Sequence, residues 1–381
     1  MIEVIPDSEK THWVNRTPES IRSYLQLSRL DRPVGYWLLA LPGWIGLAFA
    51  GLTYGLNWED LKWAALILIG AIAMRGAGCT YNDIVDQDLD AQVERTALRP
   101  LPAGTITTKQ AWIWLFMQCG VGLIVLLCLP RLAQIVSLFS IPLVAAYPFM
   151  KRITWWPQIW LGLTFNWAFL VAESIKISIY EQVLDYRPIH DPSFFDLSFG
   201  FYIGLVFWTI GYDTIYACQD SKDDAIIGIK STARKFGKKV KFGVAFCYLA
   251  SLLFLFPGFY FQEISIIYIY SNWDLSVWMS SIPSLHFYRL DYIVNFYAIF
   301  LILPFASHLI WQVTRFKLSD DTNYLKLFKS NVTTAIALIV PIIVLYIFAL
   351  HIFEWGPDRL NWPWESREDL LRADPIPLTA P

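Results

Sequence analysis

The sequence predicts an all-α polytopic membrane protein with about nine transmembrane helices. Of its 381 residues, 56% are hydrophobic and only 16% are charged, and the mean hydropathy is +0.43. Soluble domains usually carry about a quarter charged residues, so the composition excludes an ordinary soluble enzyme. Aromatic residues make up 17% of the chain, with 18 Trp, which suits rings placed at membrane interfaces. The net charge of −2 leaves no positive excess for phosphate backbones, so we expect no nucleic-acid partner.

Nine apolar runs of about 20 residues, the length that crosses a bilayer, define the predicted helices. They are residues 33–53, 61–81, 109–129, 131–148, 157–177, 196–216, 240–262, 291–313 and 331–353. Helices are expected because lipid offers no hydrogen bonds to an open backbone. The sequence therefore predicts one transmembrane unit over 33–353. An amphipathic segment, 1–32, precedes it, and a tail rich in Pro and Trp, 354–381, follows it.

The distribution of positive charge predicts the topology. With the N-terminus inside, the inner segments hold 21 of the 30 Lys and Arg residues and the outer segments hold eight. This bias predicts that the N-terminus and the polar loops 82–108 and 217–239 face the matrix or cytoplasm. Residues 178–195 and 257–290 then form outer insertions, the second suited to an interfacial position. We expect 257–290 and the tail 354–381 to form a contact surface for a protein partner.

A first acidic motif closes the second predicted span. On a helix, Asp83, Asp86 and Asp90 fall within about 60° of one another, and Asn82 extends this arc to about 100°. Arg75 lies on the same stripe, inside the predicted membrane region. Three like charges on one face repel each other, so the pattern indicates that a cation binds there.

A second acidic motif ends the sixth predicted span. Asp213, Asp220 and Asp224 lie within about 40° on a helical wheel. Asp220 and Asp224 each follow Asp86 and Asp90 by 134 residues, which fits a weak internal duplication. One acidic run alone would fit a solvated loop face. Two matched runs at membrane depth favour a functional site.

Paired acidic faces flanked by Lys and Arg indicate a diphosphate bound through Mg²⁺, which prefers one or two carboxylates plus phosphate oxygens. A calcium loop is excluded because Ala91 and Ala97 stand where an EF-hand needs Gly and Glu. The predicted metal ligands are Asn82, Asp83, Asp86, Asp90, Asp220 and Asp224. The predicted diphosphate ligands are Arg95, Lys151, Arg152 and Lys230. Apolar helices surround these residues, so an isoprenoid chain suits the rest of the substrate.

At these motifs the chain resembles the UbiA superfamily of intramembrane aromatic prenyltransferases, over roughly residues 20–335. The NDxxDxxxD pattern of that family matches Asn82 to Asp90, and its DxxxD pattern matches Asp220 and Asp224. The 4-hydroxybenzoate polyprenyltransferase branch is the most similar, through the stretches 29–33, 147–152 and 212–232. Leu98 departs from the pattern, since relatives usually carry Asn there.

The resemblance implies a helical bundle with a central cavity and Mg²⁺-dependent transfer from polyprenyl diphosphate to 4-hydroxybenzoate. The prenyl group would join the ring carbon ortho to the hydroxyl, a step of ubiquinone biosynthesis, in the mitochondrial inner membrane or bacterial plasma membrane. It implies catalytic roles for Asp86, Asp220 and Asp224. The expected residues around the aromatic substrate are Arg29, Arg32, Arg75, Tyr147 and Tyr216. The expected partners are the two substrates and membrane lipid.

Two alternatives remain open from the sequence. The acceptor could be homogentisate, a naphthoate or another phenolic acid of a meroterpenoid pathway. The chain could also serve as a lipid-binding structural subunit of an inner-membrane complex, although a silent copy has no reason to keep clustered like charges.

Overall fold

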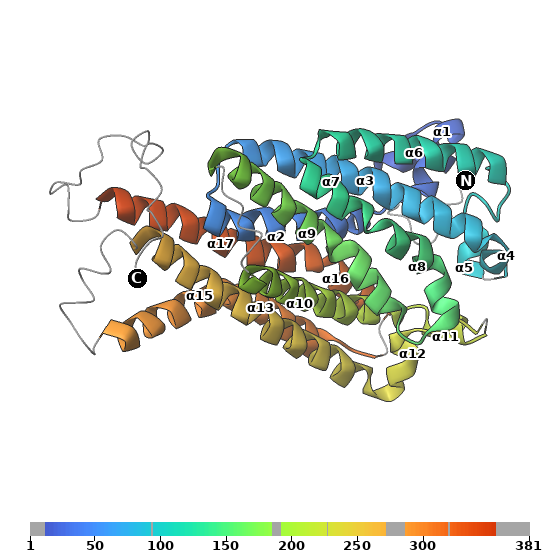
Figure 1. The fold of residues 1–381 in the computed structure, drawn as a ribbon. Coiled ribbons are helices and arrows are strands. Elements are labelled where there is room, and N and C mark those ends of the chain that lie inside the picture. The colour runs from blue at the N-terminus through green and yellow to red at the C-terminus, as the bar shows by residue number, and fades with distance from the viewer. Residues whose placement is uncertain are drawn as a thin grey trace.

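Long helices run along a common direction in the computed structural model (Figure 1), which describes residues 12–92, 94–184, 192–226, 228–271, 286–318 and 321–355. Within these ranges all regular secondary structure is helical. The long helices are α2 (Val34–Tyr54), α3 (Glu59–Val85), α6 (Thr108–Cys128), α9 (Pro157–Leu184), α10 (Pro192–Ala217), α13 (Val240–Ser271), α15 (His286–Arg315) and α17 (Asn331–Trp355). The all-α membrane fold predicted from the sequence is thereby confirmed.

Shorter helices join the long ones, mostly at one end of the bundle. They are η1 (Trp13–Arg16), α1 (Glu19–Leu27), α4 (Gln87–Asp90), α5 (Glu94–Ala97), α7 (Arg131–Leu138), α8 (Ile141–Ile153), α11 (Ser221–Ile226), α12 (Thr232–Phe236), η3 (Gly237–Lys239) and α16 (Asp321–Lys329). α4, α5, α11 and α12 lie together on the right of Figure 1, whereas α17 ends on the left.

The described residues contain seven helical stretches long and apolar enough to cross a membrane, against the nine that the sequence predicts. The other two predicted spans fall on α9 and α10, which are 28 and 26 residues long. α9 carries Glu173 and Lys176 and α10 carries Asp213, so polar side chains interrupt both. The span expected at 131–148 is divided into α7 and α8.

The most enclosed helices lie at the centre of the bundle. α2 packs against α3, α9 and α17, and α10 packs against α9 and α13. Their shared core contains Phe49, Phe169, Phe201 and Trp208, which are fully buried. By contrast α6 exposes a row of large apolar side chains, including Phe116, Ile124 and Leu127. Such a face is stable against lipid, which is consistent with α6 standing on the outside.

The two polar loops meet at the same end of the bundle, as predicted. The Lys230 N–H, between α11 and α12, donates a hydrogen bond to the Lys151 carbonyl near the end of α8 at 2.9 Å. The Lys151 side chain in turn contacts Asp86, which follows α3. These contacts bring three parts of the sequence to one polar end.

Buried charges lie at the opposite end. The Lys176 ammonium donates to both Asp60 oxygens, at 2.8 and 2.9 Å, and to the Gly55 carbonyl at 2.7 Å. Ser198 of α10 donates to the Glu173 carboxylate. These bonds tie the α2–α3 connection and α10 to α9. α9 and α13 also extend into the segments 178–195 and 257–290, whereas most of the tail 354–381 lies outside the described residues.

Candidate active site

A cavity of about 680 Å³ opens between α2, α3, α6, α8, α9 and α10. One end is polar and is lined by Arg29, Arg32, Arg75, Asn82, Asp83, Arg99, Asp213, Gln219 and Lys329. The other end is lined by apolar side chains such as Leu66, Val125, Leu129 and Val171. The cavity therefore combines a charged region with a long apolar wall.

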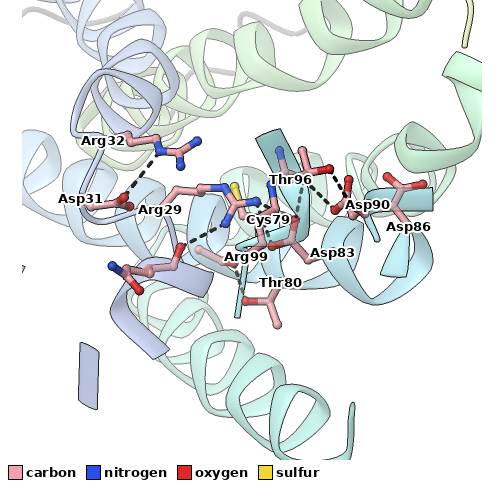
Figure 2. A network of polar contacts seen from close by, with 12 residues as sticks. Arg29, Asp31, Arg32, Cys79, Thr80, Asp83, Asp86, Asp90, Thr96 and Arg99 are labelled. Atoms are coloured by element: carbon pink, nitrogen blue, oxygen red, sulfur yellow. Dashed lines mark hydrogen bonds and ion pairs between the residues drawn. The ribbon is translucent and has the colours of Figure 1, made fainter. Parts of the chain in front are cut away.

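Asp83, from the last turn of α3, lies in a network of arginines (Figure 2). Its side chain is 1% exposed and accepts hydrogen bonds from Arg29 Nη2 on both oxygens, at 2.7 and 2.8 Å. Arg99 lies 3.5 Å from the same carboxylate and 2.7 Å from Asp90. Thr96 donates to the Asp90 carbonyl at 2.7 Å and closes the loop. Two guanidinium groups thus compensate two buried carboxylates.

The carboxylate of Asp86, which is labelled in Figure 2, takes partners other than Arg29 and Arg99. It is fully buried, and it binds the Lys151 ammonium and, at 2.7 Å, Arg152 Nη2. The two cations come from the last turn of α8, where the helix dipole favours positive charge. Lys230, also predicted to bind the diphosphate, donates from Nζ to the Ile153 carbonyl at 3.0 Å.

The continuous helix expected over 82–90 is only partly present. α3 ends at Val85, and Asp86 separates it from α4. Hydrogen bonds from Asp86 N to Asn82 O and from Asp90 N to Asp86 O keep the chain coiled. Because Asp86 faces α8 while Asp83 and Asp90 share Arg99, the expected single acidic face is divided in two.

Arg29 has a left-handed backbone, with φ 56°, which is uncommon for a residue with a side chain. It follows the end of α1, a position where helices often place glycine. Burial lowers the pKa of its guanidinium, but Asp83, Cys79 and Asp31 together outweigh burial and raise the pKa above its ordinary value. Arg29 is therefore held as a cation, and its position depends on both the turn and the ion pair.

The second acidic motif does not form one helical face. The wheel that placed Asp213, Asp220 and Asp224 together assumed a continuous helix, but α10 ends at Ala217 and α11 begins at Ser221. Asp213 lines the cavity, whereas Asp220 precedes α11 and Asp224 lies in it, and both are partly exposed. Asp224 N still donates to Asp220 O at 2.9 Å, so these two residues stay one turn apart although the helix that carries Asp213 has ended.

Four further residues predicted to face the aromatic substrate line the cavity. Arg75 donates to the Cys79 sulfur and lies 5.6 Å from the centre of the Phe165 ring. Gly35 leaves room for it, since a Cβ there would lie 2.8 Å from Arg75 Nε. Tyr147 and Tyr216 line the same space. Arg32 also lines it, and its Nε lies 3.5 Å from Asp31.

Magnesium fits the donor chemistry of this end of the bundle. Asp and Asn oxygens are its preferred protein ligands, and it commonly uses few of them together with phosphate oxygens. The described residues contain no group of three His, Cys, Asp or Glu side chains that could hold a metal. An all-protein cage is therefore not formed here, and the six predicted ligands stay a prediction. The Arg95 side chain lies outside the described residues.

Sequence reasoning did not select several residues at the polar end. Arg99 stands in the stretch beside the first motif, and Asp213 was placed on the second wheel, yet neither was taken as a site residue. Phe328 and Lys329 reach the cavity from α16, more than 100 residues beyond the second motif. Phe328 lies 4.5 Å from the Tyr216 ring, a contact that no local pattern could indicate.

Comparison with known proteins agrees with this architecture. The chain is 46% identical to human mitochondrial 4-hydroxybenzoate polyprenyltransferase over 231 residues, 60% of this chain and 57% of that protein. It is 41% identical to the Arabidopsis thaliana protein of the same name over 249 residues, 65% of this chain and 57% of that protein. The match thus spans less than two thirds of these curated relatives.

Solved structures share the fold. A UbiA homologue from Aeropyrum pernix K1 aligns with a TM-score of 0.53 at 20% identity, covering 83% of this chain and 98% of that one. A digeranylgeranylglyceryl phosphate synthase aligns with the same TM-score at 17% identity, over 87% and 100%. The profile of the UbiA prenyltransferase family matches residues 39–281, which is more than half of the chain. This protein is an integral membrane protein and belongs to the UbiA prenyltransferase family.

Proposed function

We propose that the protein transfers a polyprenyl group from polyprenyl diphosphate to the carbon ortho to the hydroxyl of 4-hydroxybenzoate. The observation that carries this proposal is the single cavity with a cationic and acidic end and a long apolar wall. A diphosphate on an isoprenoid chain needs both regions at once. The curated relatives named for this reaction support the choice of substrates.

Mg²⁺, bound by oxygens of both acidic motifs, would supply charge neutralisation to the departing diphosphate. The protein's own cations assist this departure. Lys151 and Arg152 are 24% and 41% exposed at the side chain, so they can reach phosphate oxygens while still beside Asp86. Charge that develops on the leaving group then meets preorganised donors, which is where electrostatic catalysis is strongest.

Side chains of the cavity protect and direct the allylic cation that remains. The Tyr147 and Tyr216 rings lie where aromatic faces can shelter it from water. After the ring carbon attacks, the ring must lose one proton. We assign the Asp213 carboxylate, which lines the same cavity, as the acceptor of that proton.

Arg75 is our choice among the three arginines expected to bind the substrate carboxylate. Arg29 already binds both oxygens of Asp83, and Arg32 forms an ion pair with Asp31 at 3.5 Å. Buried Arg75 Nε makes no hydrogen bond within the described part of the chain. A 4-hydroxybenzoate carboxylate would satisfy it. Replacement by Leu should raise KM for 4-hydroxybenzoate more than KM for the prenyl donor.

The test of the function is a Mg²⁺-dependent prenylation assay on the purified protein with a panel of acceptors. Product from 4-hydroxybenzoate, absent when EDTA is added, supports the proposal. Product only from homogentisate, a naphthoate or another phenolic acid would assign a different acceptor. No turnover with any acceptor would favour a structural subunit that binds lipid.

We further propose that the active site faces the matrix of mitochondria or the bacterial cytoplasm. Labelling of single-Cys variants at positions 222 and 359 should then report opposite sides of an inner membrane.

We also propose that the outer insertion 257–290 and the tail 354–381 bind a protein partner. Deleting 356–381 should weaken a co-purifying partner and leave prenylation nearly intact.

A further inference from the structure

Four lysines lie together outside the cavity, where α12 leads into α13. Lys235, Lys238, Lys239 and Lys241 are all exposed, and none of them lines the cavity. Within the described residues, no ion pair links any of them to a carboxylate. We call these four residues the α12–α13 basic surface. Its charge is not used by the site described above.

An apolar stripe begins directly after this surface. Phe242, Phe246, Leu249 and Leu253 are 75%, 58%, 55% and 65% exposed. Their spacing of four, three and four residues places them on one face of α13. The stretch Thr232–Tyr260 is apolar and long enough to cross a membrane. The stripe therefore faces lipid tails, with the lysines at the level of the headgroups.

Aromatic rings beside the α12–α13 basic surface indicate how deep it lies in the membrane. The Arg234 guanidinium and the Lys235 ammonium lie 5.4 and 5.8 Å from the centre of the Trp155 ring. Trp156 packs edge-on against Phe236, with ring centres 5.7 Å apart. Tryptophans of this kind concentrate at the boundary between headgroups and acyl chains. These contacts attach α12 to the α8–α9 junction, so the lysines are presented by a packed element.

We propose that the α12–α13 basic surface binds the headgroup of an anionic phospholipid, whose acyl chains lie along the α13 stripe. Cationic clusters next to a membrane helix attract anionic lipids. Here the cations and the apolar stripe adjoin, as a phosphate and its acyl chains do. A free phosphate would use only the lysines, and an acidic protein face would leave the stripe in contact with lipid. The proposal is independent of the reaction that the cavity performs.

The test measures which lipids stay bound to the full-length protein in nanodiscs of dioleoyl phosphatidylcholine with a minor share of dioleoyl phosphatidylglycerol. Native mass spectrometry gives the ratio of the two lipids on the protein. We compare the wild type with Lys238→Gln/Lys239→Gln/Lys241→Gln. The matched control is Lys62→Gln/Lys109→Gln/Arg131→Gln, which removes three exposed basic side chains from other helices. A Lys→Arg triple at 238, 239 and 241 checks that charge is what matters.

We expect phosphatidylglycerol to be enriched on the wild type, on the control and on the Lys→Arg triple. The Lys→Gln triple at 238, 239 and 241 should lose this enrichment by about tenfold or more. The proposal is overturned if that triple keeps the enrichment. It is also overturned if the control loses as much, since the net charge of the protein, and not this surface, would then explain the enrichment. Displacement of phosphatidylglycerol by millimolar inorganic phosphate would also overturn it.

Discussion

The two acidic motifs match in sequence but differ in their electrostatic surroundings. Asp83 and Asp86 in the first motif are buried and ion-paired with Arg29, Arg99, Lys151 and Arg152. The second motif lies in a loop between α10 and α12, where Asp220 and Asp224 are partly exposed. Backbone carbonyls take part in holding that loop, since Lys230 N donates to Lys151 O and the Arg234 side chain donates from Nη1 to Asp224 O.

This difference indicates a division of labour between the motifs. Carboxylates buried among guanidinium groups are costly to disturb, because removing one partner leaves an uncompensated charge. Partly exposed carboxylates on a loop can change partners at lower cost. The first motif should therefore support both the fold and catalysis, and the second motif should support catalysis with little effect on the fold.

The largest expected effect is on turnover. Asp86→Ala and Asp224→Ala should each lower kcat by about a thousandfold, as loss of one preorganised electrostatic group does. Thermal unfolding in detergent should separate them, because only Asp86→Ala leaves Lys151 and Arg152 without their carboxylate. Near-normal turnover in either variant would refute the site with two motifs.

The next effect concerns stability. Arg29→Ala should lower the free energy of unfolding by about 3–5 kcal/mol, since it leaves Asp83 buried and less compensated. Lys230→Ala removes an exposed hydrogen bond to the Ile153 carbonyl and should cost only about 1 kcal/mol. Chemical or thermal denaturation in one detergent measures both. Equal losses of unfolding free energy in the two variants would contradict the proposed contrast between the motifs.

A smaller effect is expected for the carboxylate that lines the cavity between the motifs. Asp213→Asn keeps the shape of the side chain but cannot accept the ring proton, so kcat should fall about a hundredfold. KM for both substrates should change little. An unchanged kcat would assign proton removal to another group.

The smallest expected effect is on the protection of backbone amides from hydrogen exchange. The first motif is buried and keeps its Arg and Lys partners when Mg²⁺ is removed, whereas Asp220 and Asp224 of the second motif are partly exposed. EDTA should therefore raise amide hydrogen exchange in 218–226 and leave 82–90 nearly unchanged. A rise of amide exchange in 82–90 alone would contradict our view that the second motif changes its partners more easily than the first.

The sequence was sufficient for the fold class and for the meeting of the two polar loops. Apolar runs of membrane length and the bias of Lys and Arg both report directly on the bilayer, so neither depends on tertiary detail. It also predicted helices where the central α9 and α10 lie, although charges such as Lys176 and Asp213 make both less apolar than the other long helices. Lys176 is compensated inside the bundle by Asp60, a pairing that no local pattern indicates.

The site was predictable in its residue types but not in its pairings. The helical wheels assumed continuous helices, but the helices break at Asp86 and after Ala217, and Asp86 binds cations of α8 while Asp83 and Asp90 share Arg99. Arg99 was missed because its partners, Asp83 and Asp90, are set by the turn that follows α4. Lys329 was missed because α16 lies in a segment expected to be an inner loop. Contacts between distant segments leave no periodic signal.

The left-handed backbone of Arg29 makes the effect of one substitution depend on another. Glycine at position 29 relieves a backbone cost of about 1 kcal/mol, yet it deletes the guanidinium that compensates Asp83. In an Asp83→Asn background the buried carboxylate is gone. Arg29→Gly then loses one hydrogen bond, from Arg29 Nη1 to the Gln26 carbonyl, but it relieves the backbone and removes a buried cation that lacks the Asp83 charge. Arg29→Gly should then destabilise the wild type and stabilise the Asp83→Asn variant, which is sign epistasis between a turn and a buried charge.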